Sequence, residues 1–257
     1  MRKVTRPRLL TAAVALGAAL LVGVGGAAAG SADEHGAGTS TPRHDNQIEN
    51  LGLVKNEIKA YYGDAGDGKP AADSHYARDV KRVERSLSAW LRVSSRHADK
   101  PAVVFDIDDT VLSNYNYEAT HDFGYDPVTN GECVAAHCFP AIFGMTDLVS
   151  WAHEHNLAVF YVTGRPDTQQ DDTAANLAEQ GFPTPDGLFT KDKVAPYPPY
   201  LPCSPNCSTI EYKSLTRAHV ESMGYQIVAT VGDQESDLKG GHSGRTFKMP
   251  NPMYYLP

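Results

Sequence analysis

The stretch VVFDIDDTVLSN, residues 103–114, runs from an apolar segment directly into a cluster of acidic residues. Its first three residues are typical of a buried strand, and Asp106, Asp108 and Asp109 then place three carboxylates within four positions. Moving a carboxylate out of water is costly unless it is paired or bound to a cation. Either the cluster lies at the exposed end of the strand, therefore, or a positive charge lies among the carboxylates.

The first 29 residues have the order of a secretory signal peptide. Four basic residues in MRKVTRPR come first, an apolar stretch rich in Ala and Gly follows, and the run Ala27-Ala28-Ala29 supplies a small-residue cleavage site. A retained membrane anchor is the alternative, because the apolar stretch is nearly long enough to span a bilayer. We favour cleavage, and expect a secreted chain without stable membrane association. Residues 30–44 are polar and Gly-rich and are expected to form a disordered leader.

Cleavage after Ala29 would remove four basic residues and no acidic ones, taking the formal charge from −8 to −12. Such an acidic chain is not expected to bind a nucleic acid polymer, because that binding depends on basic surface. The remaining length is typical of one domain, which we predict over residues 45–257.

The four cysteines form two close pairs along the chain, Cys133 with Cys138 and Cys203 with Cys207. An even number in an exported chain predicts disulfides, although four cysteines allow three different pairings. We expect each cysteine to pair with its near neighbour. A structural zinc site with His137 as an additional ligand is the alternative. The spacings in CVAAHC and CSPNC are wider than a CxxC knuckle and favour disulfides.

Hydrophobic periodicity predicts helices over 45–62 and 74–96, before the acidic cluster. Beyond residue 101, short apolar runs alternate with helical patterns. Strands are expected over 102–105, 158–162, 187–190, 226–231 and 245–248, and helices over 144–156, 168–180 and 214–223. The alternation predicts an α/β fold with a Rossmann-like, mostly parallel sheet and helices on both faces. Residues 113–140 are expected to form a small cap insert after the first strand.

Polar residues recur where the predicted strands end, which is where open α/β sheets bind their ligands. Thr163, Gly164 and Arg165 follow the second strand, and Asp233 follows the fourth, with Asp237 four residues later. Lys213 is expected just ahead of the helix that precedes the fourth strand. Each group alone is compatible with an ordinary turn or helix cap. Together they place carboxylates, a hydroxyl and two cationic side chains at one sheet edge, where a divalent cation is the natural partner of Asp106.

With these motifs the chain resembles the haloacid dehalogenase (HAD) superfamily of phosphohydrolases. The order is DxDxT after an apolar strand, then TG, then Lys, then GDxxxD. The segments VTGRP, EYKSLTR and VGDQESDL, and the tail RTFKMPNPMYYLP, resemble its class B-like acid phosphatases, a branch that includes plant vegetative storage proteins. The resemblance covers residues 45–257. It departs at Glu235, where an aromatic residue is more usual.

The resemblance implies a reaction through an aspartyl-phosphate. Asp106 would attack phosphorus, and Asp108 would protonate the leaving oxygen and then activate water. The residues expected to contact the phosphoryl group are Thr163, Gly164, Arg165 and Lys213, and Lys213 would also offset the charge of Asp106.

The implied cofactor is Mg²⁺, which prefers oxygen ligands. Asp106 and Asp233 would bind it by their side chains and Asp108 by its main-chain carbonyl. Asp237 would bind it directly or through a water molecule. Asp109 has no expected part in the site and is predicted to lie at the start of a helix.

The expected function is that of a secreted, Mg²⁺-dependent acid phosphatase of small phosphomonoesters. A phosphotransferase with the same intermediate is one alternative. A weakly active storage or binding protein is another, but its mark would be loss of the nucleophile, and Asp106 is present. The aromatic residues of the insert would either stack on a substrate or form the core of the cap; they are Tyr115, Tyr117, His121, Phe123 and Tyr125.

Overall fold

The computed structural model describes residues 48–256. The predicted signal peptide, residues 1–29, and the predicted leader, residues 30–44, lie outside this range, as does the start of the helix expected from residue 45. Within the described range no helix combines the length and the apolar character needed to cross a membrane.

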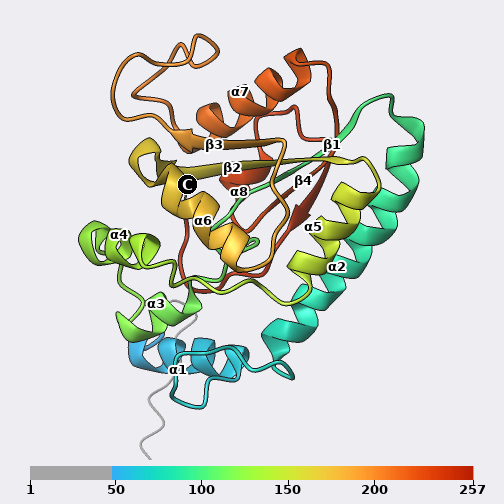
Figure 1. Ribbon diagram of the computed structural model, residues 1–257. Helices are drawn as coiled ribbons and strands as arrows, with labels where there is room; N and C mark the ends of the chain where they lie inside the picture. The colour runs from blue at the N-terminus through green and yellow to red at the C-terminus, as the bar shows by residue number, and fades with distance from the viewer. Residues whose placement is uncertain (1–47, 257) are drawn as a thin grey trace, which may run out of the picture. The chain divides into compact units, whose positions relative to one another are not determined.

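A five-stranded parallel sheet forms the centre of the fold (Figure 1). The strands are β1 (Pro101–Phe105), β2 (Ala158–Pro166), β3 (Gly187–Lys191), β4 (Gln226–Gly232) and β5 (Arg245–Lys248), in the spatial order β3-β2-β1-β4-β5. Because β1 is the central strand, the acidic residues that follow it emerge at the middle of the carboxyl edge. All five strands were expected from the sequence, and the predicted α/β class is confirmed.

The helices occupy both faces of the sheet, as predicted (Figure 1). They are α1 (Leu51–Tyr62), α2 (His75–Ser94), α3 (Tyr115–Thr120), α4 (Pro127–Ala135), α5 (Met145–Glu154), α6 (Gln170–Glu179), α7 (Thr209–Ser222) and α8 (Glu235–Leu238). Side chains of β1 alternate between the two faces. Val103 and Phe105 belong to the core cluster that contains side chains of α2 and α5, whereas Ala102 and Val104 belong to the cluster that contains side chains of α7.

The start of α7 differs from the prediction. The helix begins at Thr209, whereas the sequence pattern placed its start at residue 214. Ser208 and Glu211 form a capping box, in which each side chain accepts a hydrogen bond from the main-chain N–H of the other. This pair stabilises the first turn. Lys213 therefore lies inside the helix, and the expectation that it precedes the helix is wrong.

The predicted insert between β1 and α5 contains two short helices, α3 and α4, and its aromatic residues are mostly packing residues. Tyr115 is fully buried and stacks on Tyr62 of α1, with ring centroids 4.1 Å apart. Tyr117 is also buried and stacks on His121. His121 and Tyr125 are exposed, and 70% of the surface of Tyr125 is accessible. Tyr115 and Tyr117 are therefore packing residues, although Tyr115 packs on α1 and not within the insert alone.

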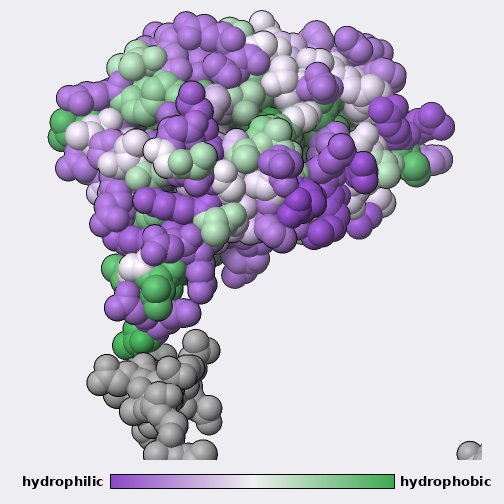
Figure 2. Space-filling view, turned by 90° about the horizontal axis from the view of Figure 1, so that it is seen from below, coloured by the Kyte–Doolittle hydropathy of each residue, from purple (hydrophilic) through white to green (hydrophobic). Residues whose placement is uncertain are grey.

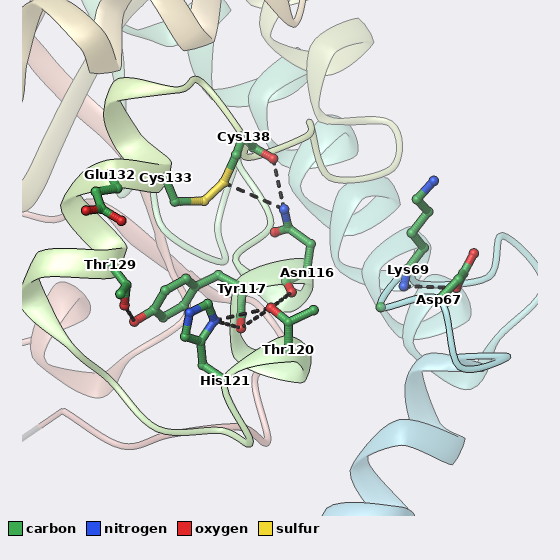
Figure 3. A pocket seen from close by; sticks show the side chains of 11 residues that line it. Asp67, Lys69, Asn116, Tyr117, Thr120, His121, Thr129, Glu132, Cys133 and Cys138 are labelled. Atoms are coloured by element: carbon green, nitrogen blue, oxygen red, sulfur yellow. Dashed lines mark hydrogen bonds between the residues drawn. A yellow bond between two sulfur atoms is a disulfide. The ribbon is translucent and has the colours of Figure 1, made fainter.

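Both expected disulfides are present, Cys133–Cys138 at the end of α4 and Cys203–Cys207 in the segment before α7. The first one lines an open cavity of about 500 Å³ between α3, α4 and the loop that follows α1 (Figure 3). Asp67 and Lys69 lie on the loop side of this cavity, and His121 lies on the side of α3. On the face of the molecule seen in Figure 2, hydrophilic side chains predominate.

Candidate active site

The structure brings the predicted polar residues together at the carboxyl edge of the sheet. Asp106 follows the central strand β1, and Asp233 follows its neighbour β4. Thr163 and Arg165 lie in the last part of β2, on the other side of β1. Asp237 lies on α8, and Lys213 reaches the site from α7. All six side chains belong to buried residues.

Lys213 connects two of the carboxylates. Its Nζ donates hydrogen bonds of 2.5 Å to Oδ1 of Asp106 and of 2.5 Å to Oδ1 of Asp237. Burial by itself would lower the pKa of Lys213, but the charges of the two carboxylates outweigh that effect and raise it above its usual value. The lysine is therefore held fully charged at the centre of the site.

Oδ2 of Asp106 and Oδ1 of Asp233 both face the hydroxyl of Thr110. Oγ1 of Thr110 lies 3.3 Å from Oδ2 of Asp106 and 3.4 Å from Oδ1 of Asp233. Carboxylate oxygens of Asp106, Asp233 and Asp237 lie within 4.8 Å of one another. Burial, reinforced by the charge of Asp237, raises the pKa of Asp233 to about 7, and burial also raises that of Asp106 well above its usual range. Without further positive charge nearby, Asp106 and Asp233 therefore resist ionisation.

The donor set fits a divalent metal ion. Lys213 supplies only one positive charge beside three buried carboxylates. When the carboxylates are ionised, the cluster therefore has a net negative charge. Hard oxygen ligands at such a position suit Mg²⁺. The two oxygens of Asp237 already accept hydrogen bonds, Oδ1 from Lys213 and Oδ2 from the main-chain N–H of Gln234 at 2.8 Å. Oδ2 of Asp106 and Oδ1 of Asp233, by contrast, are contacted only by the hydroxyl of Thr110 among the described residues.

Asp108 is paired with Arg165. Nη2 of the guanidinium donates to Oδ1 of Asp108 at 2.7 Å, and Nε lies 3.1 Å from Oδ2. Asn114 donates a further hydrogen bond to Oδ1. Burial would raise the pKa of Asp108, but the charge and hydrogen bonds of Arg165 lower it below its usual value. The structure therefore places Arg165 in the site, against the carboxylate predicted to handle protons.

Thr163 and Gly164 lie where β2 departs from regular pairing with β3, between Val162 and Pro166. Oγ1 of Thr163 accepts a hydrogen bond of 3.1 Å from the main-chain N–H of Arg165. Gly164 is exposed, and a Cβ atom built on it would meet no heavy atom within 4 Å. The main chain at Gly164 therefore borders open space between Thr163 and Arg165.

Asp109 does not start a helix, so that prediction is wrong. Its φ is 50°, in the left-handed region, and the next helix begins at Tyr115. The side chain is fully buried; Oδ1 accepts from the main-chain N–H of Asn114 at 3.0 Å, and Oδ2 accepts from the hydroxyl of Tyr254 at 2.7 Å. The bond with the main chain of Asn114 is local, and such local hydrogen bonds of a short carboxylate allow an aspartate to adopt this conformation. The bond with Tyr254 ties the same loop to a distant segment.

Several side chains to which the sequence gave no role contact the predicted site residues, among them Thr110, Asn114, Gln234 and Asn251. Tyr254 contacts the neighbouring Asp109. Thr110 belongs to the DxDxT motif, and Gln234 lies inside VGDQESDL. Asn251 and Tyr254 belong to the C-terminal tail, whose motif pointed to the family but not to a position in the site.

Comparisons with known proteins show what this chain is similar to. The family model described as HAD superfamily, subfamily IIIB (acid phosphatase), matches residues 43–257. A stem 28 kDa glycoprotein of Glycine max is 35% identical over 186 residues, which are 70% of each chain. Acid phosphatase 1 of Solanum lycopersicum is 32% identical, covering 70% of this chain and 69% of the tomato protein. The fold resembles the class C acid phosphatase of Bacillus anthracis with tungstate bound, with a TM-score of 0.59 at 19% identity over 79% of this chain and 86% of that one.

Proposed function

Because the chain belongs to the acid phosphatases of HAD subfamily IIIB, we propose that it is a secreted, Mg²⁺-dependent phosphatase that hydrolyses small phosphomonoesters through an aspartyl-phosphate. One observation carries this proposal. Asp106 stands at the end of the central strand, with one carboxylate oxygen bound by Lys213 and the other directed toward Thr110 and Asp233. A buried carboxylate held in this way is oriented for attack and cannot rotate freely.

In the first step, an oxygen of Asp106 forms a bond to phosphorus while the bond to the leaving oxygen breaks. A phosphomonoester dianion repels a carboxylate nucleophile, so the reaction depends on positive charge around the phosphoryl group. Lys213 supplies that charge next to Asp106. Thr163, Gly164 and Arg165 border the same edge and would hold the phosphoryl oxygens. In the second step, water attacks phosphorus and releases inorganic phosphate from Asp106.

Asp108 is the proposed proton donor to the leaving oxygen and the proposed base for the water. The ion pair with Arg165 lowers the pKa of Asp108. To donate a proton, Asp108 therefore requires the guanidinium of Arg165 to turn toward the phosphoryl oxygens when substrate binds. A phosphoryl dianion attracts a guanidinium strongly and with matching geometry. The exchange would release the carboxyl group of Asp108 to carry a proton.

Asp106 and Asp233, together with the main-chain carbonyl of Asp108, are the proposed ligands of Mg²⁺, and Asp237 is proposed to act through a bound water. When bound, the ion would neutralise the developing charge on the phosphoryl oxygens. Secretion is supported by the sequence order of residues 1–29 and by two disulfides, which persist in oxidising compartments.

Removal of the metal tests the function directly. We expect a chelator to abolish hydrolysis across a panel of phosphomonoesters, and added Mg²⁺ to restore it. Ca²⁺ should restore much less, because it takes more ligands at longer distances and would displace the phosphoryl group from Asp106. Released phosphate is the measurement. Full activity in excess chelator would exclude the metal-binding role proposed for Asp233.

The role of Asp108 is tested by the leaving group. Asp108→Asn should slow formation of the phospho-enzyme more for sugar and nucleoside phosphates than for nitrophenyl phosphate, because nitrophenolate leaves without a proton. General acid catalysis contributes about 10²–10⁴-fold, which sets the expected size of the difference. Rapid-quench measurement of the first turnover avoids the second step, in which Asp108 also acts. Equal losses for both substrate types would mean that Asp108 only positions other groups.

A further inference from the structure

The C-terminal tail, residues 249–256, runs from the end of β5 along the carboxyl edge of the sheet. The main-chain N–H of Met249 donates to the carbonyl of Gly232 at 2.8 Å, beside the end of β4. Met249 and Met253 are both buried in the hydrophobic core. These two side chains anchor the tail on either side of Asn251, which the intervening prolines at 250 and 252 restrict further.

Asn251 is oriented by the tail and contacts Asp233. Its Oδ1 accepts a hydrogen bond of 2.8 Å from the main-chain N–H of Met253, so its Nδ2 is the atom that faces the site. That Nδ2 donates to Oδ2 of Asp233 at 2.7 Å. The side-chain amide of Gln234 donates to the same oxygen at 2.6 Å. Oδ2 of Asp233 therefore has two donors, and Oδ1 is the oxygen left facing Thr110 and Asp106.

The tail also fixes the groups around Asn251. Oε1 of Gln234 accepts a hydrogen bond of 3.0 Å from the main-chain N–H of Leu256, so the second donor to Asp233 is itself held by the tail. The hydroxyl of Tyr254 donates to Oδ2 of Asp109, which lies in the loop that follows β1. The tail thus connects the loop that carries Asp106 and Asp108 with the loop that carries Asp233.

We infer that the tail is part of the cation site and that Asn251 and Tyr254 are positioning residues: Asn251 turns Oδ1 of Asp233 toward the position between Asp233 and Asp106, and Tyr254 fixes the loop of Asp106. The inference rests on the proposed function, because that position is the proposed Mg²⁺ site. A carboxylate with one oxygen held by two donors presents the other in a single orientation. Loss of such supporting contacts typically weakens metal binding by about 10–100-fold.

The test compares Asn251→Ala and Tyr254→Phe with Tyr255→Phe in the full mature chain. Tyr255 adjoins Tyr254 but is 72% exposed, so the two tyrosine variants each remove one hydroxyl in different surroundings. Mg²⁺ binding is measured calorimetrically without substrate. We expect affinity to fall about 10–100-fold for Asn251→Ala, by a smaller factor for Tyr254→Phe, and not at all for Tyr255→Phe. The Mg²⁺ concentration for half-maximal activity should rise in parallel, and excess Mg²⁺ should restore kcat with KM near the wild-type value.

Wild-type Mg²⁺ affinity in a folded Asn251→Ala variant would overturn the inference. So would a loss of kcat that excess Mg²⁺ does not restore, since that outcome indicates a structural role only. If Asn251→Ala does not fold, the comparison of Tyr254→Phe with Tyr255→Phe decides, and equal affinities would reject the role of the tail. A wild-type chain that binds no Mg²⁺ and hydrolyses no ester would instead overturn the proposed function itself.

Discussion

Asp106→Asn is expected to abolish phosphate release and, in the absence of Mg²⁺, to leave the folded protein at least as stable as the wild type. The amide has nearly the same shape as the carboxylate but cannot attack phosphorus, and loss of a nucleophile typically lowers kcat by about 10³-fold or more. Stability should not fall, because Asp106 is buried close to two other carboxylates. Replacing it removes that repulsion, and Lys213 keeps its ion pair with Asp237.

Initial rates and thermal unfolding, both measured with and without Mg²⁺, check this expectation. Asp171→Asn is the matched control, because Asp171 lies exposed on α6 and the same substitution there should change neither quantity. If Asp106→Asn retained more than a small fraction of the wild-type rate at an unchanged melting temperature, another residue would be the nucleophile.

The sheet and the principal site residues were predictable because their signals are local. Each strand is a short apolar run, and the polar residues at its end follow within a few positions, as Asp106 follows Phe105 and Asp233 follows Val231. In a parallel sheet, the ends of neighbouring strands meet at one edge whatever the details of the connections. Order along the chain therefore predicts proximity in space, and the structure confirms that proximity for Asp106, Asp233 and Thr163.

The parts that the sequence did not predict depend on contacts between distant segments or on weak local signals. The pairing of Arg165 with Asp108 joins residues 57 positions apart, and neither residue carries a local sign of its partner. The bond between Tyr254 and Asp109 spans 145 positions. The helices α3 and α4 are short, so the packing of α3 against α1 and of α4 against α6 matters more than their own periodicity. The start of α7 did have a local signal, the Ser208–Glu211 capping box, and was predictable.

Lys213→Met should lower activity, as Asp106→Asn does. Unlike Asp106→Asn, it should also lower stability. The variant loses the charge that faces the phosphoryl group, and removal of one such electrostatic contact typically lowers kcat by about 10²–10³-fold. It also leaves Asp106 and Asp237 buried without their partner, since Lys213 is only 4% exposed. Breaking a buried ion pair from one side typically lowers the free energy of unfolding by about 3–5 kcal/mol.

Denaturant unfolding in the presence of chelator measures this loss without compensation by Mg²⁺. Lys81→Met is the matched control, because Lys81 is exposed on α2 and its replacement should change stability by less than about 0.5 kcal/mol. The double variant Asp106→Asn/Lys213→Met should regain part of the lost stability, because only Asp237 then remains without its partner, but it should regain no activity. A Lys213→Met variant as stable as the control would mean that Asp106 and Asp237 take up protons instead of remaining charged, and that Lys213 is not what keeps the nucleophile ionised.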